Sequence, residues 1–331
     1  MRRPLFLLLP LVLAAWAILC PSGASAAAGM PPPPACSPSA ETCERISWIE
    51  QILWSRDIEA IPHLRAMAAG DAHERVRERS VGALATLGDY EASKVFLDRL
   101  AADPSPAVRR AAAEGIGMLR IPGPLLRLTD ALQKDSHPDV RAECARALGR
   151  MGKLAAAPFL SVALLRDPSP SVRALSAEAL ARLRTPEAAE PLREGVRDED
   201  PLVRLYAIRG LADTDPSSSA PLFRQVWETT NDPELRVEAF RGLLLSQESV
   251  KWRETGLADA DERVRFLALQ EWLSRLSRRK SGPLTLDPDT LRRIEAFLSD
   301  PVRGIRELAK SFLEKQGYRV RPSGFFYILQ R

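Results

Sequence analysis

One short phrase recurs along most of the chain: an Asp, four variable residues, an apolar residue and an Arg. Successive copies are separated by 32, 32, 32, 31, 32, 29 and 41 residues. The Asp precedes the apolar residue by five positions in every copy except the sixth, where Thr230 stands instead. A period this regular predicts a repeat array, in which each unit stacks on the next. The apolar–Arg pairs are Val76-Arg77, Val108-Arg109, Val140-Arg141, Val172-Arg173, Val203-Arg204, Leu235-Arg236, Val264-Arg265 and Ile305-Arg306.

Each unit is predicted to contain two helices. The second helix starts at the phrase, where a Ser or Asp precedes a Pro, as is typical of an N-cap followed by the first helical residue. A small residue lies three positions after the Arg and a large one seven positions after it, so both share one helix face and suit close helix packing. A shorter helical run precedes each phrase, for example from Ala92 to Leu100. The predicted N-caps are Ser105, Ser169, Asp200, Asp232 and Asp261.

The Asp-x-x-x-x-Val-Arg phrase, with the small and large residues that follow it, resembles the short HEAT-like repeats named after the phycobilisome-linker lyases. The resemblance covers roughly residues 57–316. It implies an all-α fold, a right-handed alpha-alpha superhelix (HEAT-like solenoid) of about eight helix pairs whose second helices line the concave side. The repeat serves many unrelated roles, so the fold does not name the function.

The first 26 residues are predicted to be an export signal. Arg2 and Arg3 precede the apolar run from Leu5 to Leu19, and Ala24-Ser25-Ala26 provides an A-x-A cleavage site. The run is short for a membrane span, which needs about 20 residues. We therefore expect a periplasmic or secreted protein with no membrane span after cleavage. The alternatives are an uncleaved membrane anchor or a lipidated Cys20, although bulky Leu19 departs from the small residue usual before a lipidated Cys.

The remaining chain divides into three parts. Residues 27–42 are a Pro-rich linker, residues 43–317 the repeat solenoid, and residues 318–331 an apolar tail expected to cap the last repeat. In an oxidising compartment Cys36 and Cys43 can close a small disulfide loop, and the alternative is two unpaired thiols. Cys144 falls at a small-residue core position and is expected to be buried.

The composition argues against several function classes. Basic and acidic residues number 47 and 43, and two of the Arg residues lie in the leader, so the charge is nearly balanced and no nucleic-acid partner is expected. There is no Gly-x-Ser-x-Gly elbow, and the three His residues do not form a metal-binding pattern. His73-Glu74 is a single pair, whereas the related di-iron deoxyhypusine hydroxylases use several. We expect no metal, no cofactor and no enzymatic activity.

The recurring Asp and Arg have two possible meanings. A row of Arg residues could bind phosphates or carboxylates. The interpretation we favour is a structural ladder at the turns, because both partners recur once per unit. The ladder residues are Asp103, Arg109, Asp135, Arg141, Asp167, Arg173, Asp198 and Arg204.

Positions two, five and nine after each repeat Arg should face the concave side, away from the core positions. In the middle repeats they form a stripe rich in Arg, and Arg and Tyr are frequent anchors at interfaces. This predicts a scaffold that binds a protein or peptide partner. The alternatives are an ordinary solvated face, a structural spacer, and a lyase-type enzyme or enzyme subunit that cradles a small ligand. The predicted stripe is Arg146, Arg150, Arg182, Tyr206, Arg209 and Arg241.

Overall fold

The computed structural model describes residues 42–278 and 286–330. The predicted leader, Cys20, most of the Pro-rich linker and Cys36 lie outside these residues. Cys43 is exposed in the first turn of α1. The export signal and the Cys36–Cys43 disulfide therefore remain predictions.

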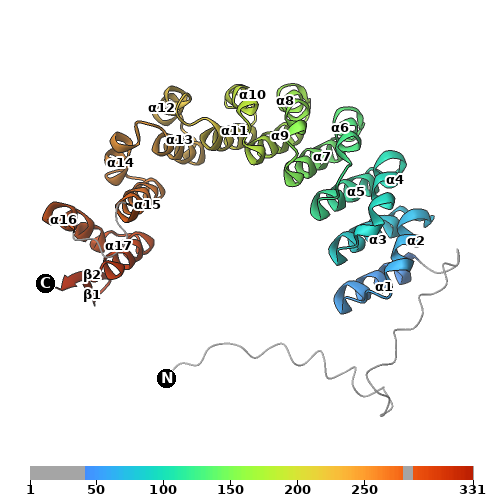
Figure 1. Ribbon diagram of the computed structural model, residues 1–331, viewed down its shortest axis with the longest axis horizontal. Helices are drawn as coiled ribbons and strands as arrows, with labels where there is room; N and C mark the ends of the chain where they lie inside the picture. The colour runs from blue at the N-terminus through green and yellow to red at the C-terminus, as the bar shows by residue number, and fades with distance from the viewer. Residues whose placement is uncertain (1–41, 279–285, 331) are drawn as a thin grey trace, which may run out of the picture.

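The described residues form an arch of helices in two layers, with the odd-numbered helices inside and the even-numbered helices outside (Figure 1). The inner layer is α1 (Thr42–Ser55), α3 (Glu74–Leu87), α5 (Pro106–Leu119), α7 (Pro138–Met151), α9 (Pro170–Leu183), α11 (Pro201–Thr214), α13 (Pro233–Leu245), α15 (Glu262–Arg278) and α17 (Arg303–Lys315). The outer layer is α2 (Ile61–Gly70), α4 (Ser93–Ala102), α6 (Leu125–Lys134), α8 (Ala157–Arg166), α10 (Ala189–Gly195), α12 (Ala220–Thr229), α14 (Ser249–Leu257) and α16 (Pro288–Ala296). The predicted all-α solenoid of helix pairs is confirmed, with the second helices on the concave side.

Small residues let neighbouring inner helices approach closely. A Cβ added to Gly117 of α5 would lie 2.8 Å from the Cα of Ala147 in α7, and one added to Gly149 of α7 would lie 2.8 Å from the Cα of Ala179 in α9. The repeat Val residues and Cys144 are fully buried beside these contacts. Stacking thus gives each unit the apolar burial that a single helix pair could not provide.

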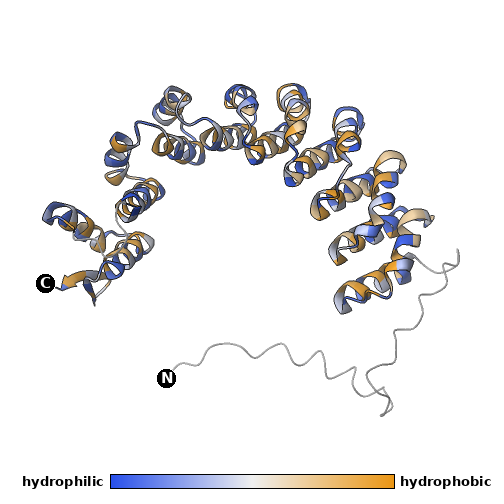
Figure 2. Ribbon diagram, in the orientation of Figure 1, coloured by the Kyte–Doolittle hydropathy of each residue, from blue (hydrophilic) through white to orange (hydrophobic). Residues whose placement is uncertain are grey.

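The apolar core is continuous along most of the arch and changes on α15. One cluster runs from Trp48 to Ala268, and a second runs from Leu269 to Leu313. Figure 2 shows apolar residues on every part of the arch, as expected when each unit contacts only its neighbours. The change of cluster falls where the repeat spacing departs most from 32 residues, at 29 and then 41.

The C-terminal tail forms a two-stranded antiparallel hairpin, which the sequence did not predict. Strand β1 (Arg319–Ser323) pairs with β2 (Phe326–Gln330), and Gly324 in the turn has a φ of +64°. Tyr318, Val320, Tyr327 and Leu329 pack against the second apolar cluster. The tail thus covers the end of the last repeat, where a solenoid needs a cap.

The predicted N-caps divide into two groups. The side chains of Asp200, Asp232 and Asp261 accept backbone amides of the first helical turn. For Ser105 and Ser169 the side-chain prediction was wrong, since neither hydroxyl caps its helix. The hydroxyl of Ser169 shares a 2.9 Å hydrogen bond with that of Ser171 instead, and this bond competes with capping.

Within residues 42–278 and 286–330, no helix combines the length and the apolar character that crossing a membrane requires.

Candidate functional site

The repeat Arg and Asp pair across successive units rather than within one unit. The Nε and Nη2 atoms of Arg109 donate to Oδ2 and Oδ1 of Asp135 at 2.7 and 2.8 Å. This fork-like geometry gives strong, directional hydrogen bonds. The same contact between units joins Arg77 to Asp103, Arg141 to Asp167, Arg173 to Asp198, Arg236 to Asp259 and Arg265 to Asp300.

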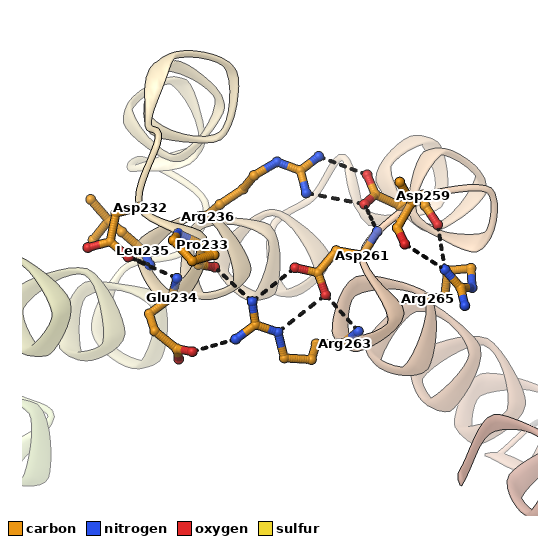
Figure 3. Close-up of polar contacts among 10 residues, drawn as sticks. Asp232, Pro233, Glu234, Leu235, Arg236, Asp259, Asp261, Arg263 and Arg265 are labelled. Atoms are coloured by element: carbon orange, nitrogen blue, oxygen red, sulfur yellow. Dashed lines mark hydrogen bonds and ion pairs between the residues drawn. The ribbon is translucent and has the colours of Figure 1, made fainter. Parts of the chain in front are cut away.

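The Asp and Arg of this ladder also have local roles, as Asp135 and Arg109 show. Oδ1 of Asp135 accepts the amide of His137 at 2.9 Å and so shapes the turn before α7. Nη1 of Arg109 donates to the carbonyl of Asp103 in its own unit at 2.9 Å. Figure 3 shows the arrangement further along, where Arg236 reaches Asp259, whose carbonyl accepts from Arg265. One Arg thus joins its own turn to the next.

The electrostatics agree with this structural role. Burial by itself would raise the pKa of Asp103, Asp135 and Asp198, but the hydrogen bonds from the paired Arg and from a turn amide hold each pKa below its ordinary value. These carboxylates are therefore ionised and already paired. The ladder Arg residues that bind them have few donors left for a ligand.

Arg204 is the exception among the predicted ladder residues. Its Nη1 donates to the carbonyls of Asp198 and Glu199 at 3.0 and 2.9 Å, and no carboxylate contact is found for it in the described part of the chain. The next unit has Thr230 where the others have Asp. The Thr230 hydroxyl accepts the amide of Asp232 at 3.1 Å, so it keeps the turn but cannot receive the Arg fork.

The predicted stripe of Arg residues lies on the inner helices, and most of it is paired with acids. Arg146 donates to Glu143 at 2.7 Å, and Glu143 is 4% exposed. Burial raises the pKa of Glu143, although Arg146 opposes the shift. Arg241 contacts Asp213 and Glu238, both at 2.7 Å. Glu143 and Glu238 hold the predicted concave position two after a repeat Arg, Asp213 holds position nine, and all three reduce the net positive charge of the stripe.

The other stripe residues meet acids as well. Arg182 donates to Glu178 at 2.7 Å along α9. Arg209 of α11 donates to Glu238 of α13 at 2.6 Å. Arg150 is the least engaged, because its nearest carboxylate oxygen, on Glu143, is 3.7 Å away.

One groove brings four stripe residues together. It measures about 680 Å³ and is bordered by α5, α7, α9 and α11. Arg150, Arg182, Tyr206 and Arg209 line it, whereas Arg146 and Arg241 do not. Two further arginines, Arg120 and Arg184, complete the lining together with Glu178, Ala181, Asp213, Gly149 and Gly152. Five Arg side chains thus face two carboxylates.

Arg120 and Arg184 are groove residues that the sequence analysis missed. They cap the C-termini of α5 and α9 with φ values of +49° and +51°, in the left-handed region. That conformation costs a residue with a Cβ about 1–2 kcal/mol. A cation near a helix C-terminus recovers about 0.3–1 kcal/mol, so the helix dipole alone does not offset the cost. A signal was available: eleven positions after the repeat Arg, the chain alternates Gly88, Arg120, Gly152 and Arg184.

Among residues 42–278 and 286–330, no group of three or more His, Cys, Asp or Glu side chains is arranged to hold a metal ion.

A family model described as HEAT repeats matches residues 45–117, 93–164 and 157–244, which together span more than half of the chain. No curated protein matches the sequence.

Several solved structures are similar. The complex of CpcE and CpcF of phycocyanin lyase from Nostoc sp. PCC7120 is 17% identical over 76% of this chain and 94% of that chain, with a TM-score of 0.46. Human deoxyhypusine hydroxylase in complex with glycerol is 19% identical over 81% of this chain and 98% of that chain, with a TM-score of 0.35. An engineered protein is 17% identical over 83% of this chain and 82% of that chain, with a TM-score of 0.47.

Proposed function

The chain belongs to the HEAT-repeat family, and from this premise we propose that it is a non-enzymatic scaffold that holds a protein or peptide partner on its concave face. The observation that carries the proposal is the groove on the inner layer. Its lining side chains come from four consecutive repeats rather than from one point. A surface of this kind is suited to an elongated partner that contacts several repeats at once.

The lining chemistry supports a protein partner. Arg150, Arg182 and Arg209 line the groove together with Tyr206, which is half-buried. Arg and Tyr provide much of the binding energy at protein interfaces, because they combine apolar area with directional hydrogen bonds. The raised pKa of Glu143 does not by itself indicate catalysis, since buried ion-pair networks also perturb the pKa of a carboxyl group.

We place this scaffold in the cell envelope or outside the cell. The support is the leader, in which Arg2 and Arg3, the apolar run and Ala24-Ser25-Ala26 follow the order of an export signal.

A lyase-type activity on a small ligand is the second candidate. The volume of the groove, about 680 Å³, lies within the range of small-molecule sites. Such sites are lined mainly by apolar and aromatic side chains, whereas this lining is dominated by charged groups. The scaffold is therefore the better supported function.

Site-specific photocrosslinking tests the proposal. A benzophenone amino acid at Tyr206 would be activated in cells that make the protein, and the adducts would be analysed by mass. The control carries the same group at Leu126, which is 76% exposed on outer helix α6. We expect a discrete protein adduct from position 206 and none from position 126. No adduct at 206, or equal adducts at both positions, would contradict the scaffold, and a small-molecule adduct would favour the lyase-type function.

A further inference from the structure

We propose that the groove binds an extended acidic peptide segment, with Arg120, Arg150, Arg182, Arg184 and Arg209 as its carboxylate receptors. We call these five residues and Tyr206 the arginine groove. The proposal rests on the scaffold function and specifies the partner's chemistry. It also assigns a role to two arginines that the repeat pattern does not explain.

The arginine groove has unused capacity for anions. In the described part of the chain, Arg120 has no ion pair or side-chain hydrogen bond, and Arg184 has one contact, to Asp213 at 3.6 Å. Arg150 is held only loosely by its acid, because its solvent-shielded Nη1 lies 3.7 Å from Oε1 of Glu143, beyond hydrogen-bond distance. Glu178, Glu238 and Glu143 lie beside Arg182, Arg209 and Arg150, respectively. The least compensated charges of the groove are therefore those of Arg120 and Arg184.

The backbone conformation at the edges of the groove also supports a functional role for Arg120 and Arg184. Arg120 and Arg184 have positive φ. The units on either side of Arg120 use Gly88 and Gly152 at this position, and Arg184 follows the unit with Gly152. Glycine adopts this conformation without a steric penalty, so placing Arg there costs stability. Strain of this kind is characteristic of functional positions. Of the three non-glycine residues with positive φ in the described part of the chain, Arg120 and Arg184 line the groove and Arg56 does not.

The distribution of charge favours an extended ligand over a compact anion. Packed helices lie about 8–10 Å apart, so four consecutive inner helices span on the order of 25 Å. An extended chain rises about 3.3 Å per residue, and about eight residues would cover this distance. A single phosphate could contact only one or two of the arginines. Carboxylates repeated along a chain could pair with several of them, and Arg–carboxylate pairs are often bidentate.

A peptide fits this surface better than a nucleic acid does. Single-stranded nucleic acids bind through aromatic platforms on which successive bases stack. Tyr206 is the one aromatic side chain among the described lining residues. The chain as a whole is also nearly balanced in charge, at +4 over 331 residues, without the broad basic face of a nucleic-acid protein.

Fluorescence anisotropy tests the proposal with a labelled octapeptide of alternating Glu and Gly. The diagnostic variant is the double substitution Arg120→Gly and Arg184→Gly, which removes two cations while placing the residue that the backbone prefers. The matched control is Arg56→Gly, since Arg56 also has a positive φ, +52°, but does not line the groove. We expect the double variant to bind at least tenfold more weakly and Arg56→Gly to match the unmodified protein.

A control peptide, a salt titration and two other anions complete the test. The peptide with Gln in place of Glu should not bind, and added salt should weaken the Glu peptide. Equal binding by the double variant, binding of the Gln peptide, or tighter binding of tripolyphosphate or single-stranded DNA would each overturn the proposal. If the crosslink from position 206 then persisted in the double variant, the scaffold function would stand and only the acidic-peptide assignment would fall. If the protein without the double substitution gave no crosslink from position 206, the scaffold function itself would be contradicted.

Discussion

Replacing Asp103 with Asn should measure how much the ladder between units stabilises the arch. The Asp103 side chain is fully buried and accepts from Arg77 at 2.8 and 2.9 Å, from Arg99 at 3.3 Å and from the amide of Ser105 at 3.0 Å. The Asn oxygen can keep the two contacts of one carboxylate oxygen, for example those from Nη2 of Arg77 and the amide of Ser105. It cannot receive the Arg77 fork on two oxygens, and it leaves the Arg77 charge, with a side chain 10% exposed, without its buried counterion.

The expected loss of unfolding free energy is about 3 kcal/mol. Removing one partner of a buried ion pair costs about 3–5 kcal/mol. The lower end applies because Arg77 keeps hydrogen bonds to the carbonyls of Asp71 and Ala72 at 2.9 and 3.2 Å. A loss of about 1–2 kcal/mol would already be measurable in a protein whose total stability is about 5–15 kcal/mol.

Urea denaturation followed by circular dichroism measures this change, and hydrogen exchange over residues 74–119 locates it. The matched control is Asp130→Asn, because Asp130 is 56% exposed and pairs with Lys134 along its own helix. An exposed pair of this kind contributes under about 1 kcal/mol. If the two variants lose equal stability, or if exchange does not increase in α3 and α5, the ladder does not join the units as argued.

Further outcomes follow from the same geometry. Thr230→Asp should stabilise the protein by about 1 kcal/mol, because the new carboxylate stands 26 residues after Arg204, the spacing that joins Arg77 to Asp103; an unchanged urea midpoint would contradict this. Stability should fall as the pH drops below about 4, since carboxylates with lowered pKa values stabilise the fold only while ionised. The carboxylates concerned are Asp103, Asp135 and Asp198. A urea midpoint that does not decrease below about pH 4 would refute the role assigned to them. In the reduced protein a thiol reagent should modify exposed Cys43 rapidly and buried Cys144 only on unfolding, because burial raises the pKa of the Cys144 thiol.

Much of the fold could be predicted because it depends on local chemistry. The 32-residue period and the Pro that begins five of the inner helices specify two helices per unit. The small and large positions also predicted which face packs, and Cys144 lies in the core as expected. The C-terminal hairpin was missed because its strands are short and its stability depends on packing against the last repeat.

The candidate site was predicted less completely. Four of the six stripe residues line the groove, because helical periodicity correctly placed their side chains on the inner layer. Periodicity did not reveal that Arg146 and Arg241 are paired with Glu143 and Asp213. Glu143 lies three residues before Arg146 on α7, a spacing at which the sequence allows a pair but does not require one. Asp213 of α11 reaches Arg241 of α13 through a contact between units, which has no fixed sequence spacing.

The repeated phrase by itself determined that this chain is an all-α array and that the Asp and Arg of each unit belong to its turns. Only the tertiary structure decided that a repeat Arg pairs with the Asp of the next unit, that this pairing is interrupted at Arg204 and resumes at Arg236, and that Arg120 and Arg184 join the groove. The physical reason is that helix formation and capping are decided within a few residues. Pairing and groove formation depend on the rise and rotation from one unit to the next, which the packing of the buried residues sets.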